Sequence, residues 1–281
     1  MNRRLLVKCF SLYRAHGYCV ALCCVLLFPA FIFAGKSIDV PSGKYKTITE
    51  AMTAVSSGDT IWVEPGVYHE RVVVYPGVAL KSRTVFKAVI DGGQRGTVVT
   101  LGKRGSITGF EVRNGTIGVF SKSVGNAVTR CRVIYNWQTG IMCVRNLAKI
   151  EDNIIAFNGA SGIQLFHVSV STGSINHNTI VFNCNHGIAI GENSPATIQN
   201  NIIAFNERFG VVLQGKSKDL RIVSNDIFGN LIGAPPIPPE NFSFDPGFSS
   251  PRIKLDFTAT SKSAVDRKGA DNEVLGARFF N

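Results

Sequence analysis

Several residue types are scarce in this sequence of 281 residues, and the scarcities narrow the class of protein. Charged residues make up only 17% and hydrophobic residues 45%, which is too apolar for a disordered chain. Beyond position 34 there are three cysteines, Cys131, Cys143 and Cys184. Because their number is odd and their spacing is unlike that of a metal site, we expect buried free thiols that act as small hydrophobic side chains.

Acidic side chains are absent from the segment 1–34, which carries four basic ones. An uncharged apolar run over residues 18–34 follows the basic stretch, as in a secretory signal. The cleavage site is poor because bulky Ile32 stands where a small residue is preferred, and the run is just long enough to span a bilayer as an uncleaved anchor. We therefore expect a secreted, periplasmic or cell-surface protein that contacts a membrane only through residues 18–34, and only if they are not cleaved.

Familiar motifs for small-molecule or nucleic-acid chemistry are also missing. The sequence has no phosphate-binding loop, dinucleotide fingerprint, zinc-finger spacing or nucleophile elbow. Its formal net charge is nevertheless +11, and only four of the basic side chains belong to the segment 1–34, so the rest of the chain is also basic. This balance permits a polyanionic partner, either acidic polysaccharide or nucleic acid, without choosing between them.

An internal repeat dominates the rest of the chain. Glycines recur at a nearly constant spacing, at Gly96, Gly118, Gly140, Gly162, Gly187, Gly210 and Gly233. Asparagines keep two fixed places in the unit, one series at Asn153, Asn178, Asn201 and Asn225 and another at Asn114, Asn136, Asn158, Asn183 and Asn206. Three short β-rich segments, separated by Asn or Gly, fill each unit. Because Asn and Gly tolerate the left-handed backbone of a tight corner, each unit is predicted to form one coil of a parallel β-helix.

The coil interpretation makes specific structural predictions. Coils stack at about 4.8 Å, so the glycines should form one column in roughly seven coils. The first Asn series should form a ladder of side-chain hydrogen bonds, at corners that require positive φ. The core is expected to include Ile155, Phe157, Ile180, Phe182, Ile203 and Phe205, or their alternating neighbours.

The two ends of such a solenoid need caps. Thr47 and Glu50 form a capping-box pattern, and apolar residues at helical spacing follow until Gly58, which predicts a short helix over the first coil. We expect three parts: a signal peptide or anchor over 1–34, a β-helix with its cap over 35–248, and a tail over 249–281 that packs on the coils.

The segment Gly58-Asp-Thr-Ile-Trp-Val-Glu-Pro-Gly-Val-Tyr-His-Glu70 resembles the opening of pectin-lyase-like right-handed β-helix proteins. Residues 244–248 and 263–266 are similar to the closing segment of many secreted members. The resemblance covers about residues 38–281 and implies an all-β, right-handed parallel β-helix. It leaves the activity open, because this fold hosts lyases, hydrolases, esterases, epimerases and non-enzymatic binders.

The resemblance also implies a ligand groove on the outer face of the strand that follows the Asn–Gly corner. Successive side chains of a strand point to opposite faces of the sheet. This alternation predicts inward side chains such as Leu165 and Leu213, and the following outward, substrate-binding residues: Phe120, Lys122, Met142, Gln164, Phe166 and Gln214. A calcium-dependent lyase needs several converging carboxylates and a basic residue. We expect no cofactor and no metal; Ca²⁺ is the alternative, although no carboxylate cluster stands in register to hold it.

One set of polar residues does stand in register. Arg145, His167 and Glu192 each lie five residues after a repeat glycine, in three consecutive coils. A His beside a carboxylate can act as a general base, and an Arg can hold a uronate carboxylate; the alternative is that strand ends are simply polar. His177 and His186 lack a third ligand in register and are interpreted as corner residues.

Two functions follow from these observations. The first is an exported β-helix protein that binds polysaccharide, acidic or neutral, with lyase-like or hydrolase-like processing left open. The second is a non-catalytic periplasmic or cell-surface scaffold, similar to the NosD-like repeat proteins of copper-site maturation. We expect a monomer with polysaccharide, and no nucleic acid, as its partner.

Overall fold

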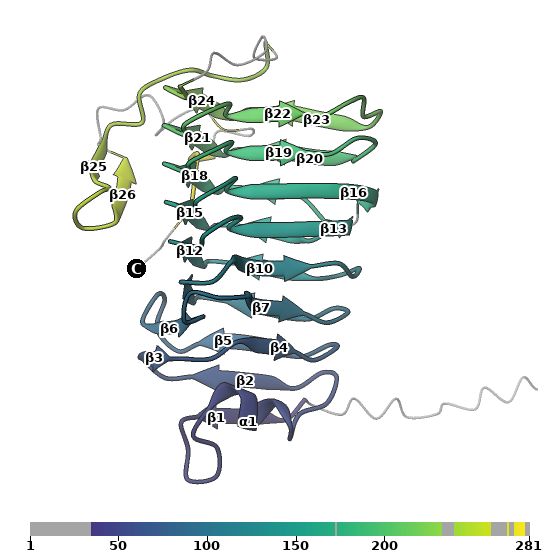
Figure 1. Cartoon of the computed structure of the whole chain (residues 1–281), viewed down its shortest axis with the longest axis vertical. Helices are drawn as coiled ribbons and strands as arrows, with labels where there is room; N and C mark the ends of the chain where they lie inside the picture. The colour runs from purple at the N-terminus through teal and green to yellow at the C-terminus, as the bar shows by residue number, and fades with distance from the viewer. Residues whose placement is uncertain (1–34, 172, 232–238, 260–268, 270–272, 279–281) are drawn as a thin grey trace, which may run out of the picture. The chain divides into compact units, whose positions relative to one another are not determined.

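The computed structural model describes residues 35–281 except 172, 232–238, 260–268, 270–272 and 279–281. The expected signal peptide or anchor, residues 1–34, lies outside the described residues. The chain forms a right-handed parallel β-helix whose coils are stacked one above another (Figure 1). No helix within the described ranges is long and apolar enough to cross a membrane.

Three parallel sheets run along the β-helix. The nine-stranded sheet contains β1 (Ser37–Val40), β2 (Thr60–Val63), β5 (Ala79–Ser82), β8 (Ser106–Thr108), β11 (Ala127–Thr129), β14 (Lys149–Glu151), β17 (Ile175–Asn176), β20 (Ala196–Gln199) and β23 (Leu220–Val223). The seven-stranded sheet contains β4 (Val72–Val74), β7 (Thr97–Leu101), β10 (Ile117–Ser121), β13 (Ile141–Leu147), β16 (Ile163–Ser171), β19 (Ile188–Ile190) and β22 (Val211–Leu213). The eight-stranded sheet contains β3 (Gly66–Tyr68), β6 (Ala88–Asp91), β9 (Glu111–Arg113), β12 (Arg132–Ile134), β15 (Ile154–Ala156), β18 (Thr179–Val181), β21 (Ile202–Ala204) and β24 (Asp226–Phe228). The strand numbers agree with the expectation of roughly seven coils.

The N-terminal cap is the helix α1 (Ile48–Met52), which is shorter than the segment to Gly58 that we expected. Its capping box is complete: Glu50 N–H donates to Thr47 Oγ1 at 3.1 Å, and Thr47 N–H donates to Glu50 Oε2 at 3.2 Å. The buried side chains of Ile48, Ala51 and Met52 face the coils. The helix therefore covers the open end of the solenoid, as predicted.

The predicted Asn ladder is confirmed. Nδ2 of Asn153 donates to Oδ1 of Asn178 at 2.9 Å, Asn178 donates to Asn201 at 3.0 Å, and Asn201 donates to Asn225 at 2.8 Å. The second Asn series forms an equivalent ladder that we did not predict, through Asn136, Asn158, Asn183, Asn206 and Asn230. In the coils from Asn136 onward, two corners are thus hydrogen-bonded to the next coil.

The left-handed backbone falls one residue earlier than expected. Positive φ belongs to the residues that precede the ladder, such as His177 (51°) and Asn200 (57°) before Asn178 and Asn201. Because that residue turns the chain, the next side chain is directed into the buried corner. Two neighbouring residues therefore build each corner: the first adopts the left-handed conformation, and the second supplies the buried amide side chain.

The same turn explains an error in the predicted core. Ile155, Ile180 and Ile203 are fully buried in the interior, but Phe157, Phe182 and Phe205 lie outside it. Each Phe has φ of 55° and stacks on the next one, with ring centroids 5.3 Å apart. The left-handed conformation rotates these rings to the outer surface, where they form an aromatic column.

The glycine column exists over the central coils only. A Cβ at Gly118 would lie 2.6 Å from the Gly140 carbonyl oxygen, and one at Gly140 would lie 2.7 Å from that of Gly162. Gly96 is not a member, because the pairing of Val99 with Val119 puts Val98 opposite Gly118. Gly233 lies outside the described residues.

A C-terminal tail packs on the outer face of the eight-stranded sheet. It contains the antiparallel pair β25 (Phe248–Ser250) and β26 (Asp256–Ala259). The side chains of Phe257 and Leu275 are buried against a second apolar cluster that includes Ile134, Ala156 and Ala204. Residues near the end of the chain are thereby held against its central coils.

Candidate functional site

The predicted groove residues share one row on the outer face of the seven-stranded sheet. Phe120 pairs with Met142, and Met142 pairs with Gln164, so the three side chains lie in consecutive coils. Each is partly exposed, and Gln164 Oε1 accepts a hydrogen bond from Thr139 Oγ1 at 3.2 Å. The row offers aromatic, thioether and amide groups at the regular spacing of the coils.

The other predicted groove residues flank this row: Lys122 and Gln214 directly follow β10 and β22, and Phe166 lies within β16. Lys122, Phe166 and Gln214 are exposed, and 49% of Phe166 is accessible. Leu213, which alternation placed inside, is instead 37% exposed. It belongs to β22, the edge strand of the sheet, where no further strand of the described chain covers it. The interior position of Leu165 was predicted correctly.

Arg145, His167 and Glu192 are exposed in three neighbouring coils: Arg145 lies within β13, at its β-bulge, His167 lies within β16, and Glu192 follows the end of β19. Val144 pairs with Phe166, so Arg145 and His167 follow at equivalent places, and Gly191 bonds back to Leu165 just before Glu192. Within the described residues no ion pair joins the three side chains; His167 instead packs edge-on against Phe166, at a centroid distance of 4.3 Å. The three residues are in register in the stacked coils, but among the described residues no carboxylate is bonded to His167 to fix the orientation of its ring.

The described residues do not form a metal centre, since no three His, Cys, Asp or Glu side chains come together among them. Cys131 and Cys143 are free and buried, as expected, but Cys184, which we also expected to be buried, is exposed. Burial raises the pKa of the Cys131 and Cys143 thiols to about 12 and about 11. His186 stacks on Phe209, whose N–H donates to His186 Nδ1 at 3.4 Å. These groups are used in packing and at corners.

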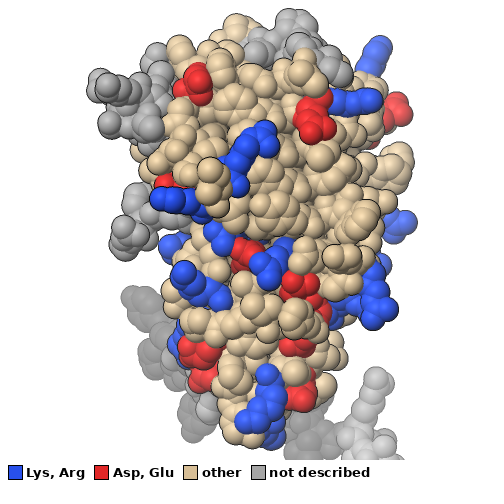
Figure 2. Space-filling view, turned by 60° about the vertical axis from the view of Figure 1, so that its left-hand side comes forward, with Lys and Arg blue, Asp and Glu red and all other residues tan. Residues whose placement is uncertain are grey.

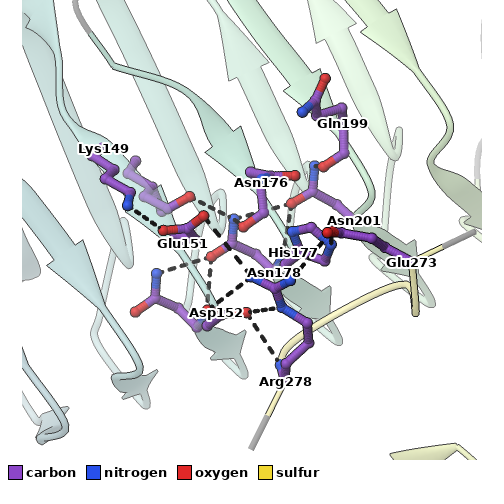
Figure 3. Close-up of polar contacts among 12 residues, drawn as sticks. Lys149, Glu151, Asp152, Asn176, His177, Asn178, Gln199, Asn201, Glu273 and Arg278 are labelled. Atoms are coloured by element: carbon purple, nitrogen blue, oxygen red, sulfur yellow. Dashed lines mark hydrogen bonds and ion pairs between the residues drawn. The ribbon is translucent and has the colours of Figure 1, made fainter. Parts of the chain in front are cut away.

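A polar cluster around His177 joins the tail to the coils (Figure 3). Arg278 Nε donates to Asp152 Oδ1 at 2.8 Å, across 126 residues of sequence. His177 is buried, and its Nε2 lies 2.7 Å from Glu273 Oε2, although the orientation does not make a hydrogen bond. Burial, together with the charge of Arg278, lowers the pKa of His177. The cluster attaches the tail, and the sequence carried no signal for it because its members lie far apart.

A hollow of about 450 Å³ opens at the corner before β4 and β7. It is lined by His69, Glu70, Arg71, Asp91, Gly92, Gly93 and Arg95. The sequence prediction missed it, because the first coils lack the regular Asn–Gly pattern. The only hint was a glycine-rich run, residues 92–96, directly before a strand. Elsewhere, on the face in Figure 2, basic and acidic side chains are interleaved and form no broad patch of one sign among the residues described.

A family model matches most of the coils. The family is described as periplasmic copper-binding protein (NosD), and the match covers residues 52–235, which is more than half of the chain. A search of curated proteins finds no match.

Several solved structures are similar to this chain. Pectate lyase Pel9A superimposes with a TM-score of 0.50 at 12% identity, over 88% of this chain and 97% of that one. The periplasmic alginate epimerase AlgG has a TM-score of 0.47 at 16% identity, over 75% of this chain and 54% of that one. The A-module of the Azotobacter vinelandii mannuronan C-5 epimerase AlgE4 gives 0.48 at 18% identity, over 67% of each chain. This chain thus spans about half of AlgG, and at such identities the likeness concerns the fold alone.

Proposed function

This chain belongs to the NosD family of periplasmic proteins, and on that premise we propose that it is an exported β-helix protein that binds polysaccharide. The observation that carries the proposal is the outer row Phe120–Met142–Gln164, in register on a rigid sheet and flanked by exposed Phe166. A row that repeats at about 4.8 Å suits a ligand that itself repeats. Flat aromatic rings and amides are suited to the mixed apolar and hydroxyl surface of sugars.

Copper, which the family description names, does not fit the described residues. Copper sites gather thiolate, thioether or imidazole ligands. Here the two buried thiols have raised pKa values, and neither His177 nor His186 belongs to a group of three metal-binding side chains in the described ranges. We therefore assign no copper site to this part of the chain.

Binding is proposed in preference to catalysis. Arg145, His167 and Glu192 remain candidates for a catalytic role, but the exposed imidazole packs on Phe166 and, among the described residues, has no carboxylate to orient it. Catalysis at this place predicts that wild-type protein shortens a polysaccharide and that His167→Ala does not. Chain length measured by size-exclusion chromatography tests this directly.

The binding proposal is tested by affinity electrophoresis of the protein in gels that contain acidic or neutral polysaccharides. We expect retardation of the wild-type protein, and at least a threefold weaker retardation of Phe166→Ala, because its exposed ring is lost. Ile253→Ala is the matched control, since Ile253 is an exposed apolar side chain of the tail. Absence of retardation in every gel would contradict the proposal and favour the scaffold alternative, for which envelope proteins should be captured without glycan.

A further inference from the structure

The corner between the eight-stranded and seven-stranded sheets forms one edge of the β-helix. In consecutive coils this edge is built by residues 69–71, 92–96, 114–116 and 135–140. The hollow described above lies at the first two of these corners. An exposed tryptophan, Trp137, lies at the fourth. The edge thus begins with basic side chains and continues to an aromatic ring.

The two carboxylates that line the hollow, those of Glu70 and Asp91, accept hydrogen bonds from other parts of the protein. Glu70 accepts hydrogen bonds from the backbone N–H groups of Ile48 and Thr49, at 3.0 and 2.8 Å. Asp91 accepts from the side chains of Arg113 and Asn114, at 3.1 and 2.8 Å. Burial raises the pKa of Asp91, but its hydrogen bonds outweigh this effect and lower the pKa overall. Asp91 is therefore paired with a cation of the protein itself, whereas Glu70 is held by neutral donors at the capping helix and keeps its negative charge beside the two arginines.

The two arginines of the hollow differ from its carboxylates. Within the described residues neither Arg71 nor Arg95 forms an ion pair, and both are exposed. Arg71 reaches across to the next coil, where a Cβ at Gly96 would lie 3.1 Å from its Nη1 atom. The absence of a side chain at Gly96 therefore leaves room for this guanidinium beside the hollow, with its donors available to a ligand.

Glycines connect the hollow to Trp137. A Cβ at Gly92 would lie 3.2 Å from Gly115 Cα, and Trp137 N–H donates to the Gly115 carbonyl at 2.7 Å. The coil above has Gly159 in the same column, where a Cβ would lie 2.1 Å from the Trp137 carbonyl oxygen. Trp137 is 66% exposed, with glycine both below and above it. A Cβ at Gly92 or Gly115 would lie 2.7 or 2.3 Å from Cγ2 of the buried Val98, so the backbone follows the core closely here and adds no side chain to the edge beside the hollow.

We propose that this edge binds a segment of a uronate-containing polysaccharide, with a sugar carboxylate paired to Arg71 and Arg95 and a neighbouring sugar ring against Trp137. This inference rests on the proposed function and adds the acidic class of the ligand. A guanidinium matches a carboxylate through two parallel hydrogen bonds. The two-coil rise from Arg95 to Trp137 is about 10 Å, so the two contacts belong to different sugars of one chain.

The test is calorimetric titration with polygalacturonate oligomers, with dextran and dextran sulfate as the neutral and sulfated arms. We expect the double variant Arg71→Met/Arg95→Met to bind polygalacturonate at least tenfold more weakly, with no change in dextran binding. Trp137→Ala should weaken binding at least fivefold. The matched controls are Arg221→Met, which removes an exposed arginine from β23, and Tyr75→Ala, which removes another exposed aromatic ring. Both should bind as the wild type does, and denaturation midpoints verify that every variant is folded.

The outcomes separate this inference from the proposed function. If the double variant binds polygalacturonate as tightly as the wild type, the edge is not the site, although polysaccharide binding stands. Tighter binding of dextran sulfate than of polygalacturonate would overturn the carboxylate assignment. Failure of the wild-type protein to bind any of the polysaccharides would overturn both proposals.

Discussion

Asp226, at the start of β24, is a carboxylate in an unfavourable environment. It is fully buried; its Oδ1 accepts a hydrogen bond from Phe244 N–H at 2.8 Å, and its Oδ2 has no hydrogen-bond partner within the described residues. Burial raises the pKa of Asp226 to about 6, against the lowering effect of the Phe244 hydrogen bond and with a further contribution from the charge of Asp245. At neutral pH the fold must therefore hold an ionised group that would be more stable in water.

We predict that Asp226→Asn stabilises the protein at pH 7.5. The native state holds the proton more tightly than the unfolded state does, so wild-type stability falls as the pH rises from about 3.8 to about 6 and stays lower above that window. The neutral amide avoids this loss, which is about 3 kcal/mol at about 1.4 kcal/mol per pKa unit. Urea denaturation at pH 7.5 and pH 4 measures it: the advantage of the variant should shrink at pH 4. Exposed Asp219→Asn is the control, and an advantage of equal size at both pH values would contradict the assignment.

At the scale of structural elements, the Asn ladders hold neighbouring coils together. Asn201 Nδ2 donates to the carbonyls of Ile175 and Gln199 as well as to Asn225, at 3.0, 2.7 and 2.8 Å. Its Oδ1 accepts from both the side chain and the backbone N–H of Asn178. One buried side chain thus satisfies groups in three coils, and no apolar residue can replace it.

Replacing Asn201 by Leu should destabilise the protein by about 3 kcal/mol, because several buried polar groups lose their partners at about 1 kcal/mol or more each. Backbone strain adds nothing, since positive φ belongs to Asn200. The control is Asn146→Leu, which removes an exposed hydrogen bond to the Lys122 carbonyl. Chemical denaturation compares the two, and the Asn201 variant should also broaden the transition, because adjacent coils cooperate. Equal midpoints would show that the ladder contributes no stability.

At the scale of the whole described structure, the tail covers an outer sheet face that is apolar over its upper coils. The ring centroids of Phe257 and Phe157, a member of the aromatic column, are 6.2 Å apart, and those of Phe248 and Phe205 are 6.4 Å apart. The ion pair of Arg278 with Asp152 fixes the end of the tail. Without the tail, this sheet would present a continuous apolar surface to water, which is typical of an interaction site or an aggregation site.

We therefore predict that deletion of residues 248–281 lowers the free energy of unfolding and causes self-association. The loss of two buried side chains, Phe257 and Leu275, costs about 4 kcal/mol at about 2 kcal/mol each. Light scattering after size-exclusion chromatography measures the mass, and denaturation measures the stability. The control is Ile253→Ser, which changes an exposed residue of the same tail. A monomeric truncated protein with an unchanged midpoint would contradict the covering role of the tail.

The sequence by itself determined the coil, the number of coils, the capping helix and the first Asn ladder. These features are periodic or local: Asn178 and Asn201 occupy the same place in their repeats, and Thr47 and Glu50 are one helical turn apart. Stacking at a constant rise converts such a period directly into contacts. Periodicity did not reveal which corner residue is left-handed, so the orientation of Phe157 and its equivalents was predicted wrongly.

Only the tertiary structure decided the basic hollow, the glycine-lined edge below Trp137 and the tail contact of Arg278. The hollow lies in the first coils, where the spacing is irregular, so that no period aligns Arg71 with Arg95. Glu70 is engaged by the capping helix and Asp91 by the next coil, and Asp152 is paired with a residue 126 positions later. Arg113 and Arg278 thus compensate the charges of Asp91 and Asp152, whereas Glu70 keeps its charge, and which carboxylates are compensated in this way is a property of the folded chain.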